Sequence, residues 1–176
     1  MSFIPLVSEQ EASGATSLAY QEIKNAYGKV PNFYAAQGTR PDAISAEMAL
    51  GANILKDAAL PRAVKEKIAL VVSGINHSSY CIAAHSEALH NLGVPKALSR
   101  QLALDYPSAP ASEAERAIFR FADKLTRQPG EIAPGDVHEL RRHAWNDAQI
   151  YETVLATAWF NFVNRISAGL GLVSDF

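Results

Sequence analysis

Two reactive side chains, Cys81 and His85, stand four residues apart in the segment SSYCIAAH at 78–85. On a helix this spacing places both side chains on one face, one turn apart. Serine is a favoured N-cap residue, and with Ser78 as the cap Cys81 becomes the third helical residue. In that first turn the unpaired N–H groups and the helix dipole favour an anion. These features favour the thiolate, which is the reactive form of cysteine.

A carboxylate, Glu66, lies about three turns earlier, near the start of a helix predicted from Arg62 to about Ile75. The short polar break at 76–79 separates that helix from a second one, predicted from about Tyr80 to Leu92. Glu66 reaches Cys81 only if the two helices fold back as an antiparallel pair. In that arrangement the Ser78 hydroxyl could bond a backbone N–H near Cys81, or the sulfur itself.

Each of these residues also has an ordinary structural interpretation. A single cysteine is usually a small buried hydrophobic residue, and Glu66 alone fits a solvated carboxylate in a first helical turn. Tyr80 and His77 are candidates for lining a substrate pocket. However, Tyr80 also fits a packed ring with a hydrated hydroxyl, and His77 a polar residue between helices. Spacing by itself therefore favours an inert, buried Cys81.

The rest of the chain is helical in pattern, which predicts an all-α fold. A proline-rich stretch at about 105–111 is interpreted as an exposed loop, so residues 1–176 are expected to form a single domain. Ser112 and Glu115 have the spacing of a capping box. Residues 32–41 are interpreted as a connection. About eight helices are predicted, at about 16–27, 42–56, 62–75, 80–92, 95–104, 112–128, 134–144 and 147–170.

The composition excludes several classes of partner. Charged residues make up 19% of the chain and the net charge is −2, so nucleic acid and anionic membranes are not expected partners. No run approaches the roughly 18 apolar residues of a membrane span, and the N-terminus lacks the pattern of a signal peptide. A single cysteine cannot form an intramolecular disulfide. Together these features predict a cytoplasmic protein.

The motif around Cys81 resembles a known signature. Glu66, eleven residues, Ser78, two residues, Cys81, three residues and His85 match the pattern E-x11-C-x-x-C-x-x-x-H. That pattern is typical of the alkylhydroperoxidase D (AhpD) and carboxymuconolactone decarboxylase superfamily, in particular its peroxidase-related branch. Two further blocks also resemble this family: YGKVPN at 27–32 resembles its entry segment, and AWFNFVNR at 158–165 its closing helix.

The resemblance implies an AhpD-like helical subunit that assembles into trimers or into hexamers, including assemblies built from dimers. In redox-active members the second cysteine of the motif attacks a peroxide and the first resolves the sulfenic acid as a disulfide. Cys81 is then the candidate peroxidatic thiol, with Glu66 and His85 as its proton relay. Ser78 stands where the resolving cysteine is expected, and a hydroxyl cannot form a disulfide.

These expectations favour a thiol-dependent peroxidase that reduces a small hydroperoxide through Cys81, with an external thiol as the reductant. No cofactor is expected, and no metal, because the histidines lack the spacing of a zinc site. One alternative is a carboxymuconolactone decarboxylase-like lyase or isomerase that acts on a small carboxylic acid through Glu66 and His85. Another is a non-catalytic oligomeric homologue that has lost the two-cysteine cycle.

One polar group on the last helix needs a separate explanation. Asn161, Asn164 and Arg165 share a face of an otherwise apolar segment, so they need hydrogen-bond partners if they are buried. We expect a structural role for them, in hydrogen bonds across subunits or to a loop.

Overall fold

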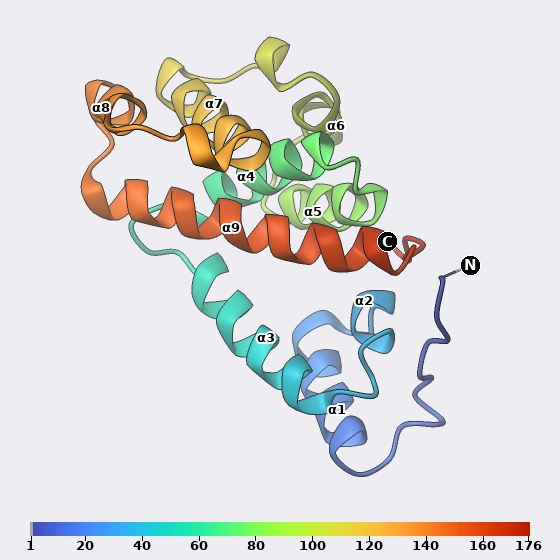
Figure 1. The fold of residues 1–176 in the computed structure, drawn as a ribbon. Helices are drawn as coiled ribbons and strands as arrows, with labels where there is room; N and C mark the ends of the chain where they lie inside the picture. The colour runs from blue at the N-terminus through green and yellow to red at the C-terminus, as the bar shows by residue number, and fades with distance from the viewer. Residues whose placement is uncertain (1) are drawn as a thin grey trace.

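The computed structural model describes residues 2–176 and confirms the all-α class, because no strand occurs in this range. Within this range there are nine α-helices, arranged as in Figure 1, and two short 3₁₀ helices. The α-helices are α1 (Gly14–Tyr27), α2 (Asn32–Ala35), α3 (Pro41–Leu55), α4 (Arg62–Ile75), α5 (Ser79–Asn91), α6 (Lys96–Asp105), α7 (Glu113–Arg127), α8 (Pro134–Arg142) and α9 (Asp147–Gly169). The 3₁₀ helices are Tyr106–Ser108 and Pro129–Glu131.

The helix that the sequence did not predict is α2, which lies in the segment interpreted as a connection. It contains four residues, so it is too short to show a helical hydrophobic period. Pro31 precedes it, and the Pro31 carbonyl accepts hydrogen bonds from the backbone N–H groups of Tyr34 and Ala35. This single turn matters because it brings aromatic side chains to the cavity described below.

At the centre of the fold lies α4, which packs against α5, α6, α7 and α9. Its residues 68–72 are all buried, which explains the broad apolar stripe in the sequence. The stretch at 105–111 connects α6 to α7, and both of these helices pack on α4. The predicted capping box is present at the start of α7, where Ser112 Oγ accepts from Glu115 N at 3.2 Å.

The long helix α9 crosses the molecule between two groups of helices (Figure 1). On one side lie α4 to α8, and on the other lie α1 to α3. Both ends of the chain lie near the last turn of α9, and Phe3 N donates to Leu170 O at 2.8 Å. No helix among residues 2–176 has the length and hydropathy that crossing a membrane requires.

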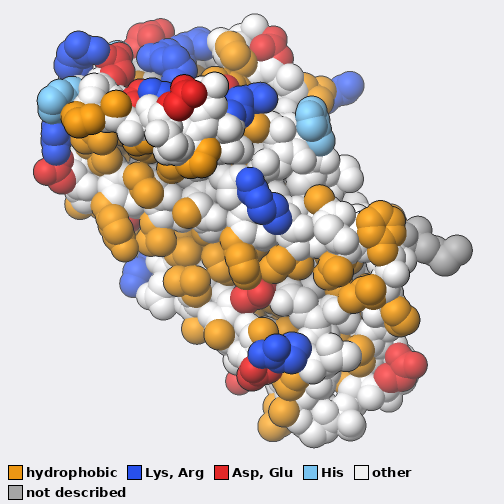
Figure 2. Space-filling view, in the orientation of Figure 1, with side chains coloured by type: hydrophobic (Ala, Val, Ile, Leu, Met, Phe, Trp, Pro, Cys, Tyr) orange, Lys and Arg blue, Asp and Glu red, His pale blue; other side chains and the backbone are white. Residues whose placement is uncertain are grey.

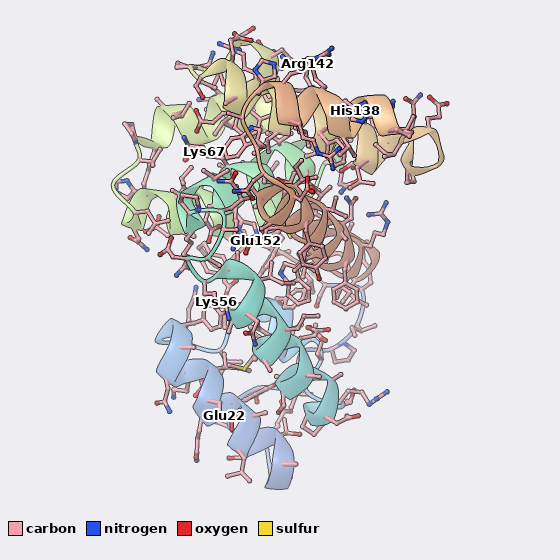
Figure 3. All side chains as sticks on the ribbon, turned by 90° about the vertical axis from the view of Figure 1, so that its left-hand side faces the viewer. Glu22, Lys56, Lys67, His138, Arg142 and Glu152 are labelled. Atoms are coloured by element: carbon pink, nitrogen blue, oxygen red, sulfur yellow. The ribbon has the colours of Figure 1, made fainter. Side chains whose placement is uncertain are left out.

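A buried ion pair fixes the connection between α3 and α4 to α9. Lys65 is 1% exposed, and its Nζ lies 2.9 Å from Glu152 Oε2 and donates to Lys56 O at 2.8 Å. The Glu152 carboxylate also accepts from the backbone N–H groups of Ala59 and Leu60. Figure 3 shows Glu152 on α9 near Lys56 at the end of α3. The backbone of this connection is therefore held by one side chain from α4, Lys65, and one from α9, Glu152.

The asparagines of α9 bond the end of α4, within the same chain. Asn164 Nδ2 donates to Ser73 Oγ at 3.1 Å, and Asn76 Nδ2 donates to both Asn164 Oδ1 and Asn161 Oδ1. Arg165 donates to Asn161 from the solvent side. These contacts agree with the expected structural role and fix the position at which α4 ends.

Candidate active site

The turn between α4 and α5 reverses the chain and makes the two helices antiparallel. His77 adopts a left-handed conformation with φ +52°, and Ser78 N donates to Ser73 O at 2.9 Å. This is the hydrogen-bond pattern of a Schellman-type helix end. Because α5 runs back along α4, Glu66 near the start of α4 comes to lie beside His85 in α5.

Glu66 and His85 form a hydrogen-bonded pair between these two helices. His85 Nδ1 lies 2.7 Å from Glu66 Oε2, and Arg62 Nε donates to Glu66 Oε1 at 3.3 Å. The side chain of Glu66 is 1% exposed, that of His85 15% and that of Arg62 46%. Burial by itself raises the pKa of the Glu66 carboxyl, but the hydrogen bond from His85 Nδ1 and the charge of Arg62 oppose burial, and the net effect lowers that pKa.

The pair fixes the orientation of the imidazole ring. An ionised Glu66 only accepts hydrogen bonds, so His85 Nδ1 is the donor. His85 Nε2 makes no hydrogen bond with any residue that the structure describes. The ring also packs edge-on against Phe160, with 4.8 Å between the centroids. The arrangement therefore presents Nε2 as the nitrogen that can accept or release a proton.

Cys81 is the third residue of α5, as the N-cap position of Ser78 predicts, and it is 3% exposed. Its Sγ lies 3.4 Å from Ser167 Oγ in α9, and Ser167 Oγ donates to Val163 O at 2.9 Å. No hydrogen bond joins Sγ to Glu66 or His85 among the described residues. Ser167 could not be recognised from the sequence pattern, because only the packing of α9 against α5 brings it to the thiol.

Cys81 and His85 line the same cavity, which has a volume of about 110 Å³. Six of its thirteen lining residues are Phe, Tyr or Trp, and these six come from α1, α2, α5, α9 and the segment after α9. The aromatic residues are Tyr27, Phe33, Tyr34, Tyr80, Trp159 and Phe176, and the remaining residues are Pro31, Gly51, Leu55, Ala84 and Val163. A substrate bound in this cavity could therefore contact both the Cys81 thiol and the His85 imidazole.

Tyr80 lines this cavity, but its hydroxyl is not hydrated as its alternative interpretation supposed. The side chain is buried, and its hydroxyl oxygen accepts from the backbone N–H of Phe33 at 3.2 Å. Burial raises the pKa of the Tyr80 phenol far above its ordinary value. Tyr80 is therefore a neutral wall that joins α5 to α2.

Two residues of this region do not make the contacts considered for them, and His77 is instead a polar residue between helices. Ser78 is buried but its Oγ has no hydrogen-bond partner among the described residues, so it bonds neither a backbone N–H nor the sulfur. The backbone of Ser78, with ψ 88°, departs from the extended conformation in which a cap hydroxyl meets the N–H groups of the first turn. His77 does not line the Cys81 cavity. Its left-handed conformation turns it outward, into a separate cleft between α4 and the α6–α7 connection.

A protein-family model matches the middle of the chain. Residues 41–124 match the model of the carboxymuconolactone decarboxylase family. This range runs from α3 into α7 and contains the α4–α5 pair with Glu66, Cys81 and His85. The match therefore includes the helices that position the candidate site.

Two solved structures resemble nearly the whole chain. The crystal structure of an alkylhydroperoxidase AhpD core, a peroxidase-related protein from Ralstonia eutropha JMP134, is 26% identical with a TM-score of 0.90. It covers 99% of this chain and 92% of that one. A peroxidase-related protein from Silicibacter sp. TM1040 is 28% identical with a TM-score of 0.89, covering 98% and 91%.

A third structure shares the fold at lower identity. The debrominase Bmp8, in complex with 2,3,4-tribromopyrrole, is 22% identical with a TM-score of 0.80, covering 99% of this chain and 94% of that one. The family model, the near-complete structural likeness and the Glu66–Ser78–Cys81–His85 spacing agree with one another. These likenesses support the alkylhydroperoxidase D-like and carboxymuconolactone decarboxylase superfamily for this chain.

Proposed function

We propose that this protein is a thiol-dependent peroxidase that reduces a hydroperoxide through Cys81, with an external thiol as the reductant. The observation that carries the proposal is the shared cavity, which holds the only thiol of the chain beside an imidazole fixed by a buried, ionised Glu66. Fold alone does not specify a peroxide, since the same fold occurs in a debrominase.

The first half of the reaction oxidises the thiol. His85 Nε2 takes the proton of Cys81, and the thiolate attacks the terminal oxygen of the hydroperoxide. The S–O bond forms as the O–O bond breaks, which gives a sulfenic acid, and His85 returns the proton to the leaving alkoxide as an alcohol. Glu66 keeps its charge throughout and holds the Nδ1–H, so its role is to orient and support the relay.

The second half requires two external thiols, because Ser78 cannot form a disulfide with Cys81. The first thiol attacks the sulfenic sulfur, releasing water and leaving a mixed disulfide. The second attacks that disulfide, releases an oxidised reductant and restores the Cys81 thiol. We propose that this cycle runs in the cytoplasm, where thiol reductants are maintained.

We also propose that the protein is a homo-oligomer. Exposed apolar side chains gather on the outer faces of α3 and α9, around a groove of about 330 Å³ that contains Leu50 and Phe162. Figure 2 shows hydrophobic side chains gathered in the band where α9 crosses the molecule. A second copy on this face would bury surface that is unusually apolar for a monomer. Sedimentation of the wild type and of Phe162→Asp tests this, and a monomeric wild type would contradict it.

The alternative functions are less well supported. A lyase acting on a multiply charged acid needs cations in its site, and no Lys or Arg belongs to the described lining of the cavity. A non-catalytic homologue has no use for a buried Glu66–His85 pair beside the thiol. Neither alternative accounts for Cys81 and His85 in one apolar space.

Trapping of the sulfenic acid tests the proposal. The protein is treated with tert-butyl hydroperoxide in the presence of dimedone, and the adduct is located by mass spectrometry. We expect stoichiometric labelling at Cys81 and a slower rate in His85→Gln. Absence of the adduct at hydroperoxide levels that fully oxidise a free thiol would contradict the proposal. A lyase would instead tolerate Cys81→Ser and lose activity in Glu66→Gln.

A further inference from the structure

The segment after α9 supplies one wall of the Cys81 cavity. Phe176 lines the cavity and meets Tyr80 edge-on, with 5.7 Å between the ring centroids. Residues 173–176 have no helical hydrogen bonds of their own, since α9 ends at Gly169. The cavity is therefore closed on this side by a side chain that no helix holds in place.

The connection between α1 and α2 anchors this segment. Lys29 Nζ lies 3.3 Å from Asp175 Oδ2 and 4.3 Å from the centroid of the Phe176 ring. Asn32 N donates to Asp175 Oδ2 at 3.2 Å, and Asn32 Nδ2 donates to Val173 O at 3.1 Å. Lys29 Nζ also donates to the backbone carbonyl of Asp175. The ion pair is partly exposed, and an exposed ion pair and an exposed cation–π contact each contribute only weakly to stability.

The aromatic walls of the cavity differ in their freedom to move. Phe33, Tyr34 and Tyr80 are buried in the core, whereas Phe176 is 49% exposed and Tyr27 51%. Tyr27 belongs to a helix and hydrogen-bonds Tyr34 through its hydroxyl. Phe176 is therefore the wall that can swing outward without unfolding a helix.

The size of the cavity limits which substrate groups fit while Phe176 stays in place. Its volume of about 110 Å³ is below the ~150 Å³ of an engineered apolar cavity that binds benzene. A compact alkyl group fits with Phe176 in place, while a ring on the substrate requires Phe176 to move. Apart from Cys81 and His85, the described lining is apolar or phenolic, so it favours an uncharged substituent.

We propose that Phe176, anchored through Lys29 and Asp175, is the movable wall of the Cys81 cavity and its size-selecting residue. It restricts access to the thiol to hydroperoxides that carry a small, compact, uncharged apolar group. The statement about hydroperoxides rests on the peroxidase function proposed above, whereas the statement about access to the thiol does not. Two experiments separate these statements.

The first experiment measures access without any turnover. Because the chain has one cysteine, every thiol adduct reports Cys81. We compare the rates of modification by iodoacetamide and by a bulky fluorescent maleimide in the wild type, Phe176→Ala and Phe3→Ala. Phe3 is the matched control, an exposed phenylalanine outside the cavity.

Phe176→Ala should raise the bulky-to-small rate ratio about tenfold or more, and Phe176→Leu should raise it less. Phe3→Ala should leave this ratio unchanged. An unchanged ratio in Phe176→Ala would overturn the proposal whatever the activity of the protein, since it would show that this side chain does not control access.

The second experiment compares tert-butyl and cumene hydroperoxide as substrates. The wild type should prefer the smaller tert-butyl compound, and Phe176→Ala should shift the ratio of rate constants toward cumene hydroperoxide by about tenfold. Lys29→Gln removes the ion pair with Asp175 and should give a smaller shift, of about fivefold or less. Salt screens this ion pair, so high salt should produce the same shift in the wild type and no further shift in Lys29→Gln. Equal preference in the wild type and Phe176→Ala would contradict the selecting role. If neither hydroperoxide is consumed, the peroxidase function fails, and the modification rates still decide the role of Phe176.

Discussion

Two neighbouring residues on α4, Lys65 and Glu66, are both 1% exposed and both pair with an oppositely charged or protonatable group. Lys65 pairs with Glu152, and both side chains also bond backbone groups of the α3–α4 connection. Glu66 pairs with His85, which lines the Cys81 cavity. The second ring nitrogen of His85, Nε2, has no hydrogen-bond partner among the described residues. The Lys65–Glu152 pair is surrounded by backbone groups, whereas the Glu66–His85 pair borders the cavity that contains the Cys81 thiol.

The difference teaches that a buried charge is not by itself a sign of catalysis. Removing charges from water is costly, so either pair needs a reason to persist. For Lys65 and Glu152 the reason is that they supply hydrogen-bond partners for backbone groups of the α3–α4 connection, which lies outside the helices. For Glu66 it is the orientation of an imidazole beside a thiol. The four predictions below test this division of roles.

The largest expected effect is on turnover in Glu66→Gln. Loss of the carboxylate leaves His85 without its anchoring charge, so we expect hydroperoxide reduction to fall between about 10²- and 10⁴-fold. Glu115→Gln is the matched control, because Glu115 also has a lowered pKa, caused by Lys67 and Ser112 against the effect of burial, but lies outside the cavity. Steady-state rates measured with excess thiol test this, and equal losses in both variants would break the distinction.

Lys65→Met should act on stability instead. It leaves the Glu152 carboxylate in a mostly buried site without its cation, which costs about 3–5 kcal/mol in the free energy of unfolding. Chemical denaturation measures this cost, and the double variant Lys65→Met/Glu152→Gln should recover part of it. A folded Lys65→Met protein should keep its turnover per molecule. A strong loss of turnover with little loss of stability would mean that the roles are reversed.

Acid should remove the contribution of Glu66 to stability. Its pKa in the folded protein lies below the ordinary value of 4.5, so the unfolded chain takes up the proton first as the pH falls. The contribution is complete above pH 4.5 and is lost as the pH falls through the lower, folded pKa. The gap in unfolding free energy between wild type and Glu66→Gln should therefore be widest near neutral pH and narrow in acid. A gap that does not vary with pH would contradict the ionised state assigned to Glu66.

The smallest expected effect concerns Ser167. Ser167→Ala removes the hydrogen bond of Cys81 and should cost about 0.5–1.5 kcal/mol in stability. Ser167→Thr keeps the hydroxyl and serves as the control for the lost hydrogen bond. Denaturation of both variants, together with the rate of dimedone labelling, measures whether this contact positions the thiol. Equal labelling rates in all three proteins would limit Ser167 to a packing role.

Much of the fold could be predicted because its signals are local. The apolar stripe of α4, the cap at Ser112 and the stop after α5 are visible as periodicity and end residues. The prediction that α4 and α5 form an antiparallel pair is confirmed, and it is what brings Glu66 to His85. The short helix α2 was missed because one turn has no period.

The rest of the site depends on contacts between distant segments. Lys65 looks like part of a solvated helix start, and only the position of Glu152, 87 residues later, shows that it is buried. Ser167 and Phe176 meet Cys81 and Tyr80 through the packing of α9 and of the segment that follows it. The resemblance in the motif suggested which residues to examine and a chemistry for them, but it contained no information about the residues that line the cavity.

The central claim is that Cys81 is the group that hydroperoxide oxidises. Consumption of tert-butyl hydroperoxide with excess dithiothreitol, measured in wild type and Cys81→Ser at equal folded concentration, tests it most directly. The serine variant keeps the fold and the Glu66–His85 pair but has no thiol. We predict that Cys81→Ser consumes hydroperoxide no faster than dithiothreitol does without protein, whereas each wild-type molecule reduces many molecules of hydroperoxide. Equal enzymatic rates in the two proteins would contradict the account.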